Sequence, residues 1–212
     1  MKKVTVTITA TIVGSLFATS IASADFQGIS CEEIESGFGV GTTYRVYVDL
    51  EEGDQLNAVF GDTVDPLLIS TTTSFYQNQF GTHTPPSSAL FPFFPSLEFD
   101  SFVTIGLLTD TGNSMLDIGI DWTNFEAGGD LETNNGSWFA TPDDAQVFEV
   151  NGKVLIGQFT TTGDVSGIIN IQGKNADLSN WQYRSVEFTC IPTPGAIALL
   201  GLAGVAARRR RK

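Results

Sequence analysis

The sequence has few basic residues, and most of them lie at its two ends. The 212-residue chain contains 11 Lys and Arg residues against 24 Asp and Glu residues. Between residues 4 and 207 the basic residues are Arg45, Lys153, Lys174 and Arg184, whereas every acidic residue falls between positions 25 and 187. Because such an acidic surface repels phosphate backbones, nucleic acid is excluded as a partner of this central part.

Histidine and cysteine are also scarce. His83 is the only histidine, and Cys31 and Cys190 are the only cysteines. This composition excludes catalysis that needs two histidines, and no Gly-x-Ser-x-Gly sequence surrounds a serine to support a Ser–His–Asp site. We therefore interpret His83 as a loop histidine and predict no catalytic residue and no enzymatic activity.

Residues 1–24 have the order of a secretory signal peptide. Lys2 and Lys3 precede an uncharged apolar run, and Ala22-Ser23-Ala24 forms a small-residue cleavage site. The alternation of Val and Thr early in this run would also suit a β-strand. The lack of charge up to Ala24, followed at once by acidic sequence, favours a signal peptide that is removed after Ala24.

Residues 191–212 consist of three successive parts. Pro192 and Pro194 stop a preceding strand because they lack a backbone donor, residues 195–207 carry no charge, and a basic cluster ends the chain. Counted from Ile191 to Ala207, the stretch without charge lies at the lower limit of about 17–25 residues that span a bilayer. Because basic residues stay on the cytoplasmic side, this end predicts a short transmembrane helix with the body outside the inner membrane.

The motif Pro192-Thr193-Pro194, the Ala/Leu/Gly segment and the cluster Arg208-Arg209-Arg210-Arg211 resemble the PEP-CTERM sorting tail of bacterial exosortase substrates. The resemblance implies an exosortase-like protease and the inner membrane as transient partners. It also implies removal of the tail and release to the cell surface or extracellular matrix. Thr193 stands where the family motif has Glu, so retention of the tail as a weak permanent anchor stays open.

Residues 25–190 show the pattern of one all-β domain. Short alternating runs bounded by Gly, Asn, Asp and Pro predict strands, and no run keeps a helical spacing over three turns. In the strand Thr42–Leu50 the apolar residues share one face. Further strands are predicted at 55–60, 66–72, 99–108, 115–120, 153–162, 167–172 and 183–190. Many short strands without intervening helices indicate a single β-sandwich, with the jelly roll as one form of it.

Residues 73–95 differ in composition from the rest of this domain. They contain four prolines, which argue against a central strand, and five phenylalanines, which argue against a free linker. We predict a long loop packed over one end of the sandwich, with a surface binding patch as the alternative.

Five phrases in the body resemble an uncharacterised module of secreted bacterial proteins that often carry the same kind of tail. They are QLNAVFGD, SFYQNQFG, FPSLEFDSFVTIG, GIDWTNFEAGG and NGSWFATPDD. This second resemblance implies secretion and supplies no catalytic residue.

The two cysteines lie near the two ends of the predicted domain. An even pair in an exported chain favours a disulfide between Cys31 and Cys190. Zinc would need three or four ligands, to which only His83 could be added. Free buried thiols are the alternative.

Loops rich in Asp, Asn and Gly at residues 110–144 are candidates for weak calcium binding. Ca²⁺ takes six to eight oxygen ligands, and the candidate ligands are Asp110, Asp121, Asp130, Asp143 and Asp144. The EF-hand pattern is absent, and plain solvated loops are the alternative. No other cofactor is expected. Trp122 and Trp138 in the same region are expected to be buried or half-buried.

Together these features predict an exported, non-enzymatic protein of the cell surface or extracellular matrix that makes weak contacts with extracellular polysaccharide or divalent cations. The alternative is a secreted polysaccharide-acting hydrolase, which requires a cleft with two carboxyl groups at a defined separation.

Overall fold

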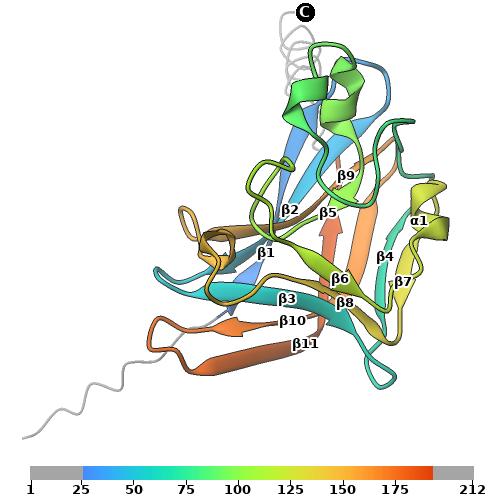
Figure 1. The fold of residues 1–212 in the computed structure, drawn as a ribbon. Coiled ribbons are helices and arrows are strands. Elements are labelled where there is room, and N and C mark those ends of the chain that lie inside the picture. The colour runs from blue at the N-terminus through green and yellow to red at the C-terminus, as the bar shows by residue number, and fades with distance from the viewer. Residues whose placement is uncertain (1–25, 193–212) are drawn as a thin grey trace, which may run out of the picture.

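The computed structural model describes residues 26–192, and these residues form two antiparallel sheets in a β-sandwich-like fold (Figure 1). The first sheet has the order β1 (Phe26–Glu35), β2 (Thr42–Leu50), β9 (Lys153–Thr161), β5 (Phe102–Val103). The second has the order β6 (Leu116–Ile118), β8 (Gly136–Phe139), β3 (Gln55–Gly61), β10 (Val165–Lys174), β4 (Leu67–Thr71), β7 (Leu131–Thr133), and β11 (Asn180–Cys190) pairs with β10. The helical segments are α1 (Thr123–Glu126) and the 3₁₀ helices η1 (Ser88–Leu90), η2 (Pro95–Phe99) and η3 (Ala145–Val147).

The alternating residues of β2 bury one face of the strand, as predicted. Tyr44, Val46, Val48 and Leu50 are buried, and the residues between them are half-buried on the opposite face. They join residues of the second sheet, such as Val59 and others of β3, β4 and β10, in one hydrophobic core. The prediction of an all-β body is therefore confirmed at the level of two antiparallel sheets that enclose this core.

Some strands differ from their predicted bounds. The segment predicted at 99–108 contributes only β5, because η2 extends to Phe99 and the chain bends at Gly106. Gly106 has a φ of +80°, and a Cβ atom there would clash with the Gln146 carbonyl oxygen. β1, β7 and β8 are not among the predicted strands, since β1 lacks a buried alternating face and the other two are short.

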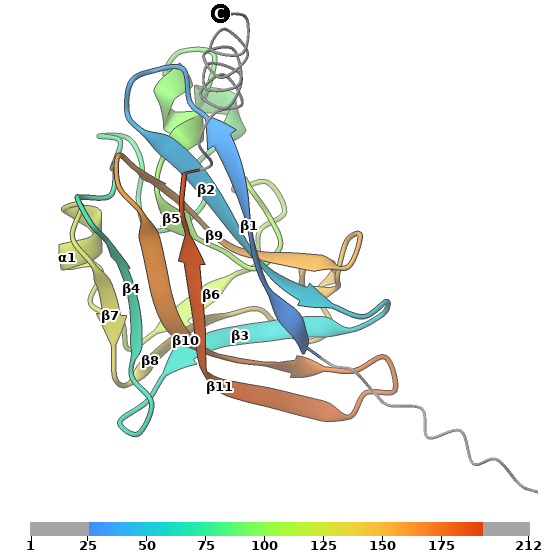
Figure 2. The same cartoon turned by 180° about the vertical axis from the view of Figure 1, so that it is seen from behind.

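β10 connects two parts of the second sheet. On one edge, the first half of β10 pairs with β4 and the second half pairs with β3. On the other edge, β10 pairs with β11 (Figure 2). At the change of partner, Asn170 is fully buried and donates from Nδ2 to the carbonyl oxygens of Phe60 and Asp65. Its Oδ1 atom accepts the Ser185 N–H, where the β10–β11 register shifts. The Asn170 side chain thus satisfies backbone groups that the irregular ladder leaves without a strand partner.

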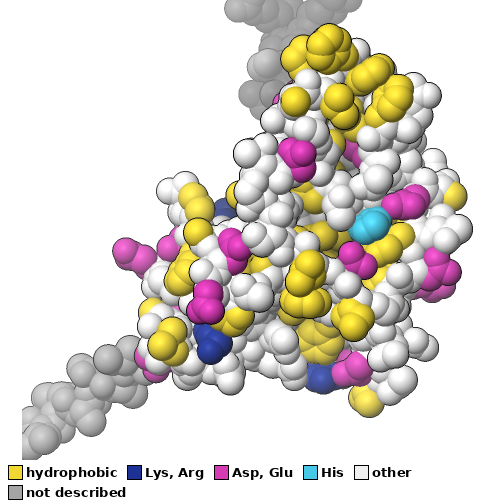
Figure 3. Space-filling model, in the orientation of Figure 1, with side chains coloured by type: hydrophobic (Ala, Val, Ile, Leu, Met, Phe, Trp, Pro, Cys, Tyr) yellow, Lys and Arg dark blue, Asp and Glu magenta, His cyan; other side chains and the backbone are white. Residues whose placement is uncertain are grey.

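The proline- and phenylalanine-rich segment packs in part and is exposed in part. Phe75 is buried against Phe125 and Phe159, with ring centroids 5.6 and 5.5 Å apart. Phe93, in contrast, is 75% exposed, and Phe80 is 47% exposed. Apolar side chains gather at the upper end of the molecule in Figure 3. The segment is a loop over one end of the domain, as predicted, with an exposed aromatic tip.

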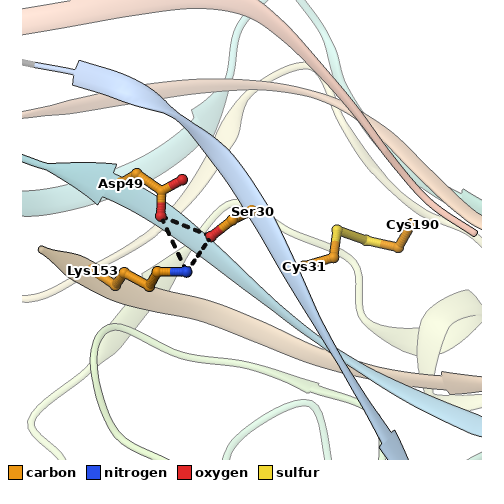
Figure 4. The surroundings of a disulfide bond; sticks show 5 residues. All are labelled: Ser30, Cys31, Asp49, Lys153 and Cys190. Carbon is orange, nitrogen blue, oxygen red and sulfur yellow. Dashed lines mark hydrogen bonds and ion pairs between the residues drawn. A yellow bond between two sulfur atoms is a disulfide. The ribbon is translucent and has the colours of Figure 1, made fainter. Parts of the chain in front are cut away.

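A disulfide joins the two sheets. Cys31 of β1 is bonded to Cys190 at the end of β11 (Figure 4). Their Cα atoms are 5.8 Å apart, and the two residues are 159 positions apart in the sequence. Beside it, Ser30 donates to Asp49 of β2 and accepts from Lys153 of β9. The predicted pairing is confirmed, and it covalently links the first and last strands of the described domain.

Both ends of the chain lie outside the described residues. This applies to the predicted cleavage site at Ala22 and Ala24 and to the sorting motif from Thr193 onward, including Pro194 and Arg208, Arg209, Arg210 and Arg211. Pro192 is the last residue described. Within residues 26–192, every helix is too short or too polar to cross a bilayer.

Removing the disulfide should destabilise the domain. We expect the double variant Cys31→Ser/Cys190→Ser to lose about 3–5 kcal/mol of unfolding free energy, because the bond closes a very long loop in the unfolded chain. Urea unfolding in parallel with wild type measures this loss, and wild type treated with reductant should match the variant. Identical midpoints for oxidised wild type and the variant would contradict the expectation.

Candidate functional site around His83

His83 lies in a polar cluster built from three segments of the chain. Its Nδ1 atom is 2.7 Å from Glu126 Oε1, and its Nε2 atom is 3.6 Å from Asp117 Oδ2. The imidazole stacks on Trp122 with ring centroids 4.3 Å apart and an interplanar angle of 6°. Trp122 Nε1 in turn donates to Asp117 Oδ1 over 3.0 Å. Figure 3 shows the chain's single histidine, in cyan, among acidic side chains on this face.

The short helix α1 places Trp122 and Glu126 in this cluster. Asp121 accepts the Thr123 N–H at the start of the helix. Phe125 is fully buried against Phe75 and Phe159, which fixes the helix on the core. The half-buried Trp122 and the exposed Glu126 meet the loop that carries His83.

The contacts of His83 hold its loop against two other segments of the chain. An ionised carboxylate only accepts, so Glu126 Oε1 receives both Nδ1–H and the backbone N–H of His83, the latter over 3.1 Å. The second ring nitrogen faces Asp117, and Trp122 covers one face of the ring. Through these contacts His83 joins its loop to β6 and α1.

A third carboxyl group, that of Asp100, interacts electrostatically with Glu126 of this cluster. Asp100 is fully buried; its Oδ1 atom accepts the Asn78 N–H over 2.6 Å, and its Oδ2 atom has no hydrogen-bond partner within residues 26–192. Burial raises the pKa of Asp100 to about 7, and the charge of Glu126 adds to the rise against hydrogen bonds from Asn78 and Ser101. Because no part of this carboxyl is exposed, it is not available to a substrate.

The pKa of Asp100 predicts a loss of stability as the pH rises. A carboxyl whose folded pKa lies above its unfolded value near 3.9 stabilises the fold fully below that value, and this contribution is lost as the pH rises through about 7. Asp100→Asn stays neutral and keeps an acceptor for Asn78. Between pH 4 and pH 8, wild type should therefore lose up to about 4 kcal/mol relative to this variant.

Urea unfolding at the two pH values measures the difference. Asp143→Asn, at an exposed position, is the matched control and should follow the wild-type profile. Parallel pH profiles for wild type and Asp100→Asn would contradict the expected role of Asp100.

The five candidate calcium ligands lie on exposed or half-exposed loops. Asp121 and Asp144 already accept nearby N–H groups, at the start of α1 and of η3. Hydrogen bonds from Thr123 lower the pKa of Asp121, and those from Ser114 and Gln146 lower the pKa of Asp144. Over residues 26–192 there is no group of three or more His, Cys, Asp or Glu residues arranged to hold a metal ion, and Asp110, Asp130 and Asp143 belong to no such group.

The cluster around His83 combines residues that are distant in the sequence. His83 precedes Asp117 by 34 positions and Glu126 by 43. The tryptophan expectations are confirmed: Trp122 is half-buried, and Trp138 is fully buried with its indole N–H donated to the Thr104 carbonyl. The phrase GIDWTNFEAGG contains two members of the cluster, but no pattern in the sequence pairs it with His83.

Comparison with protein-family models, with curated proteins and with solved structures found no match for this chain. Residues and geometry therefore carry the functional conclusion.

Proposed function

We propose that this chain is an exported, non-enzymatic protein of the cell surface or extracellular matrix. The observation that carries the proposal is the Cys31–Cys190 disulfide, because such bonds form and persist in oxidising compartments outside the cytoplasm. The order of residues 1–24 as a signal peptide and the acidic composition of the body agree with export.

The proposed delivery route uses the PEP-CTERM-like tail. β11 ends at Cys190, where the disulfide holds the chain to β1, and the Pro192-Thr193-Pro194 motif follows directly. The apolar segment and the Arg cluster would hold this end in the inner membrane until an exosortase-like protease removes it. The finer assignment of the sandwich to a jelly roll stays a prediction.

The geometry around His83 supports a role without catalysis. Both ring nitrogens of His83 face carboxylates, and the acid with the raised pKa, Asp100, is buried away from solvent. A hydrolase with a carboxylate pair would need both carboxyl groups at the surface of a substrate cleft. The proposed activity is therefore contact with components of the matrix.

Weak binding of Ca²⁺ by the loops at 110–144 is part of this proposal. Bound cations would reduce repulsion within the acidic body. Millimolar CaCl₂ should then raise the melting temperature more than NaCl of equal ionic strength, as measured by differential scanning calorimetry. Equal shifts in the two salts would leave only screening and would remove Ca²⁺ from the proposal.

Mass spectrometry of the protein from the cell envelope and the medium tests the proposed route. The mature chain should begin at Asp25, contain the disulfide, and lack the terminal Arg cluster. Deletion of residues 208–212 should let the chain leave the inner membrane without processing, because these charges hold the helix in place. A retained Met1 would contradict export by a cleaved signal. Full-length protein ending in Lys212 as the sole mature species would contradict sorting and support permanent anchoring.

A further inference from the structure

A groove lies on the outer face of the second sheet. In the registers of β8, β3, β10 and β11, the core-facing row is Trp138, Val59, Ile171 and Tyr183. Because neighbouring positions on a strand face opposite sides, the adjacent row of Phe139, Ala58, Gln172 and Gln182 faces outward. Figures 1 and 2 show these four strands side by side. Ala58 is small and 4% exposed, and it forms the floor of a groove of about 650 Å³.

A β-bulge places an amide at this groove. Gln172 pairs with Ala58, but the next residue, Gly173, pairs with Leu56, so Asn57 has no partner across the ladder. Asn57 lines the groove and is 8% exposed. The backbone carbonyl oxygen of Asn57 accepts the Ala140 N–H. The side-chain Nδ2 atom of Asn57 has no acceptor among the described residues. A buried donor without an acceptor is costly to the fold, and bulges of this kind often direct a side chain toward a ligand.

A chain of hydrogen bonds orients a second amide. Arg184 is held by Asp62 and Asp65 at 2.7 and 2.8 Å, and its Nε atom donates to Gln182 Oε1 over 3.2 Å. Gln182 Nε2 donates to Gln172 Oε1 over 3.3 Å. The side-chain oxygen Oε1 of Gln172 therefore already accepts a hydrogen bond. Its side-chain Nε2 atom remains as a donor, at an exposed position in the groove. Such preorganisation reduces the entropy lost when a ligand binds.

The lining of the groove differs in charge from the rest of this acidic protein. Its amide side chains are Asn57, Gln172, Asn180 and Gln182, and apolar contacts come from Phe139 and Pro142. Lys174 is the charged residue of the lining, which contains no Asp or Glu within residues 26–192. Amides both donate and accept, as sugar hydroxyls do, and the apolar wall suits the C–H faces of sugar rings.

We propose that this groove binds a segment of a neutral polysaccharide. The volume lies within the range of about 300–1,000 Å³ that is usual for sites of small ligands. The excess of acidic over basic residues in the protein as a whole disfavours an acidic polysaccharide. This inference rests on the proposed function, since a matrix protein would meet polysaccharide chains outside the cell. It assigns the proposed polysaccharide contact to specific residues.

Affinity electrophoresis of the full chain, purified with its disulfide formed, tests the proposal. The gels contain laminarin, hydroxyethyl cellulose or dextran as neutral probes and alginate as the acidic one. At least one neutral probe should slow wild type, and alginate should not. Gln172→Glu is nearly isosteric, removes the donor and adds a negative charge, and should raise the Kd by about tenfold or more. Thr189→Ala, exposed on β11 away from the groove, is the matched control and should bind as wild type does.

Three results would overturn the proposal: no retardation by any neutral probe, stronger retardation by alginate, or equal binding of Gln172→Glu and Thr189→Ala. Circular dichroism confirms that each variant is folded. The assay requires neither export nor removal of the tail. Loss of binding with correct export would therefore reject the groove alone, whereas binding by a chain that stays in the cytoplasm would reject the proposed location.

Discussion

The covalent link between Cys31 and Cys190 is the constraint on which the closure of the domain depends. β1 is the edge strand of the first sheet and buries no side chain completely, so its apolar contacts alone hold it weakly. β11 is the edge strand beside β10 in the second sheet. The bond joins these two edges and holds the end of β11 to β1. A protein outside the cytoplasm gains from such a bond, because cytoplasmic thiol systems do not act on it there.

Two basic side chains of the body fix the orientation of the side chains around them. Arg184 pairs with Asp62 and Asp65 and donates a hydrogen bond to the Gln182 side chain. The Gln182 side chain in turn donates to the Gln172 side chain, so this chain of contacts fixes the orientation of both amides. Lys153 approaches Asp49 over 3.7 Å and donates to Ser30 next to the disulfide. Exposed ion pairs contribute little to stability, typically below about 1 kcal/mol each. Their value here lies in fixing side-chain directions on a surface that is otherwise acidic.

Two surface features differ in chemical character. The cluster of His83, Asp117, Trp122 and Glu126 is closed, because each ring nitrogen and carboxylate already faces a partner. The groove over β3 and β10 is open; its lining includes Asn57, whose buried Nδ2 atom has no acceptor among the described residues, and the exposed Gln172. Satisfied polar groups hold a structure together, whereas unsatisfied ones at a groove favour the binding of a ligand. This contrast supports the proposed binding role of the groove.

The sequence by itself determined those features that depend on local pattern or on scarcity. The alternation from Tyr44 to Leu50 assigned β2 and its buried face, because successive side chains of a strand point to opposite sides. With two cysteines in the chain, one pairing was available, and it forms. Tertiary structure alone decided the meeting of His83 with Asp117 and Glu126, and the bulge that places Asn57 in the lining of the groove. The cluster depends on how a loop, β6 and α1 pack on the core, and the bulge depends on the pairing of β3 with β10. Both bring together residues far apart in the chain, which no local pattern of residues specifies.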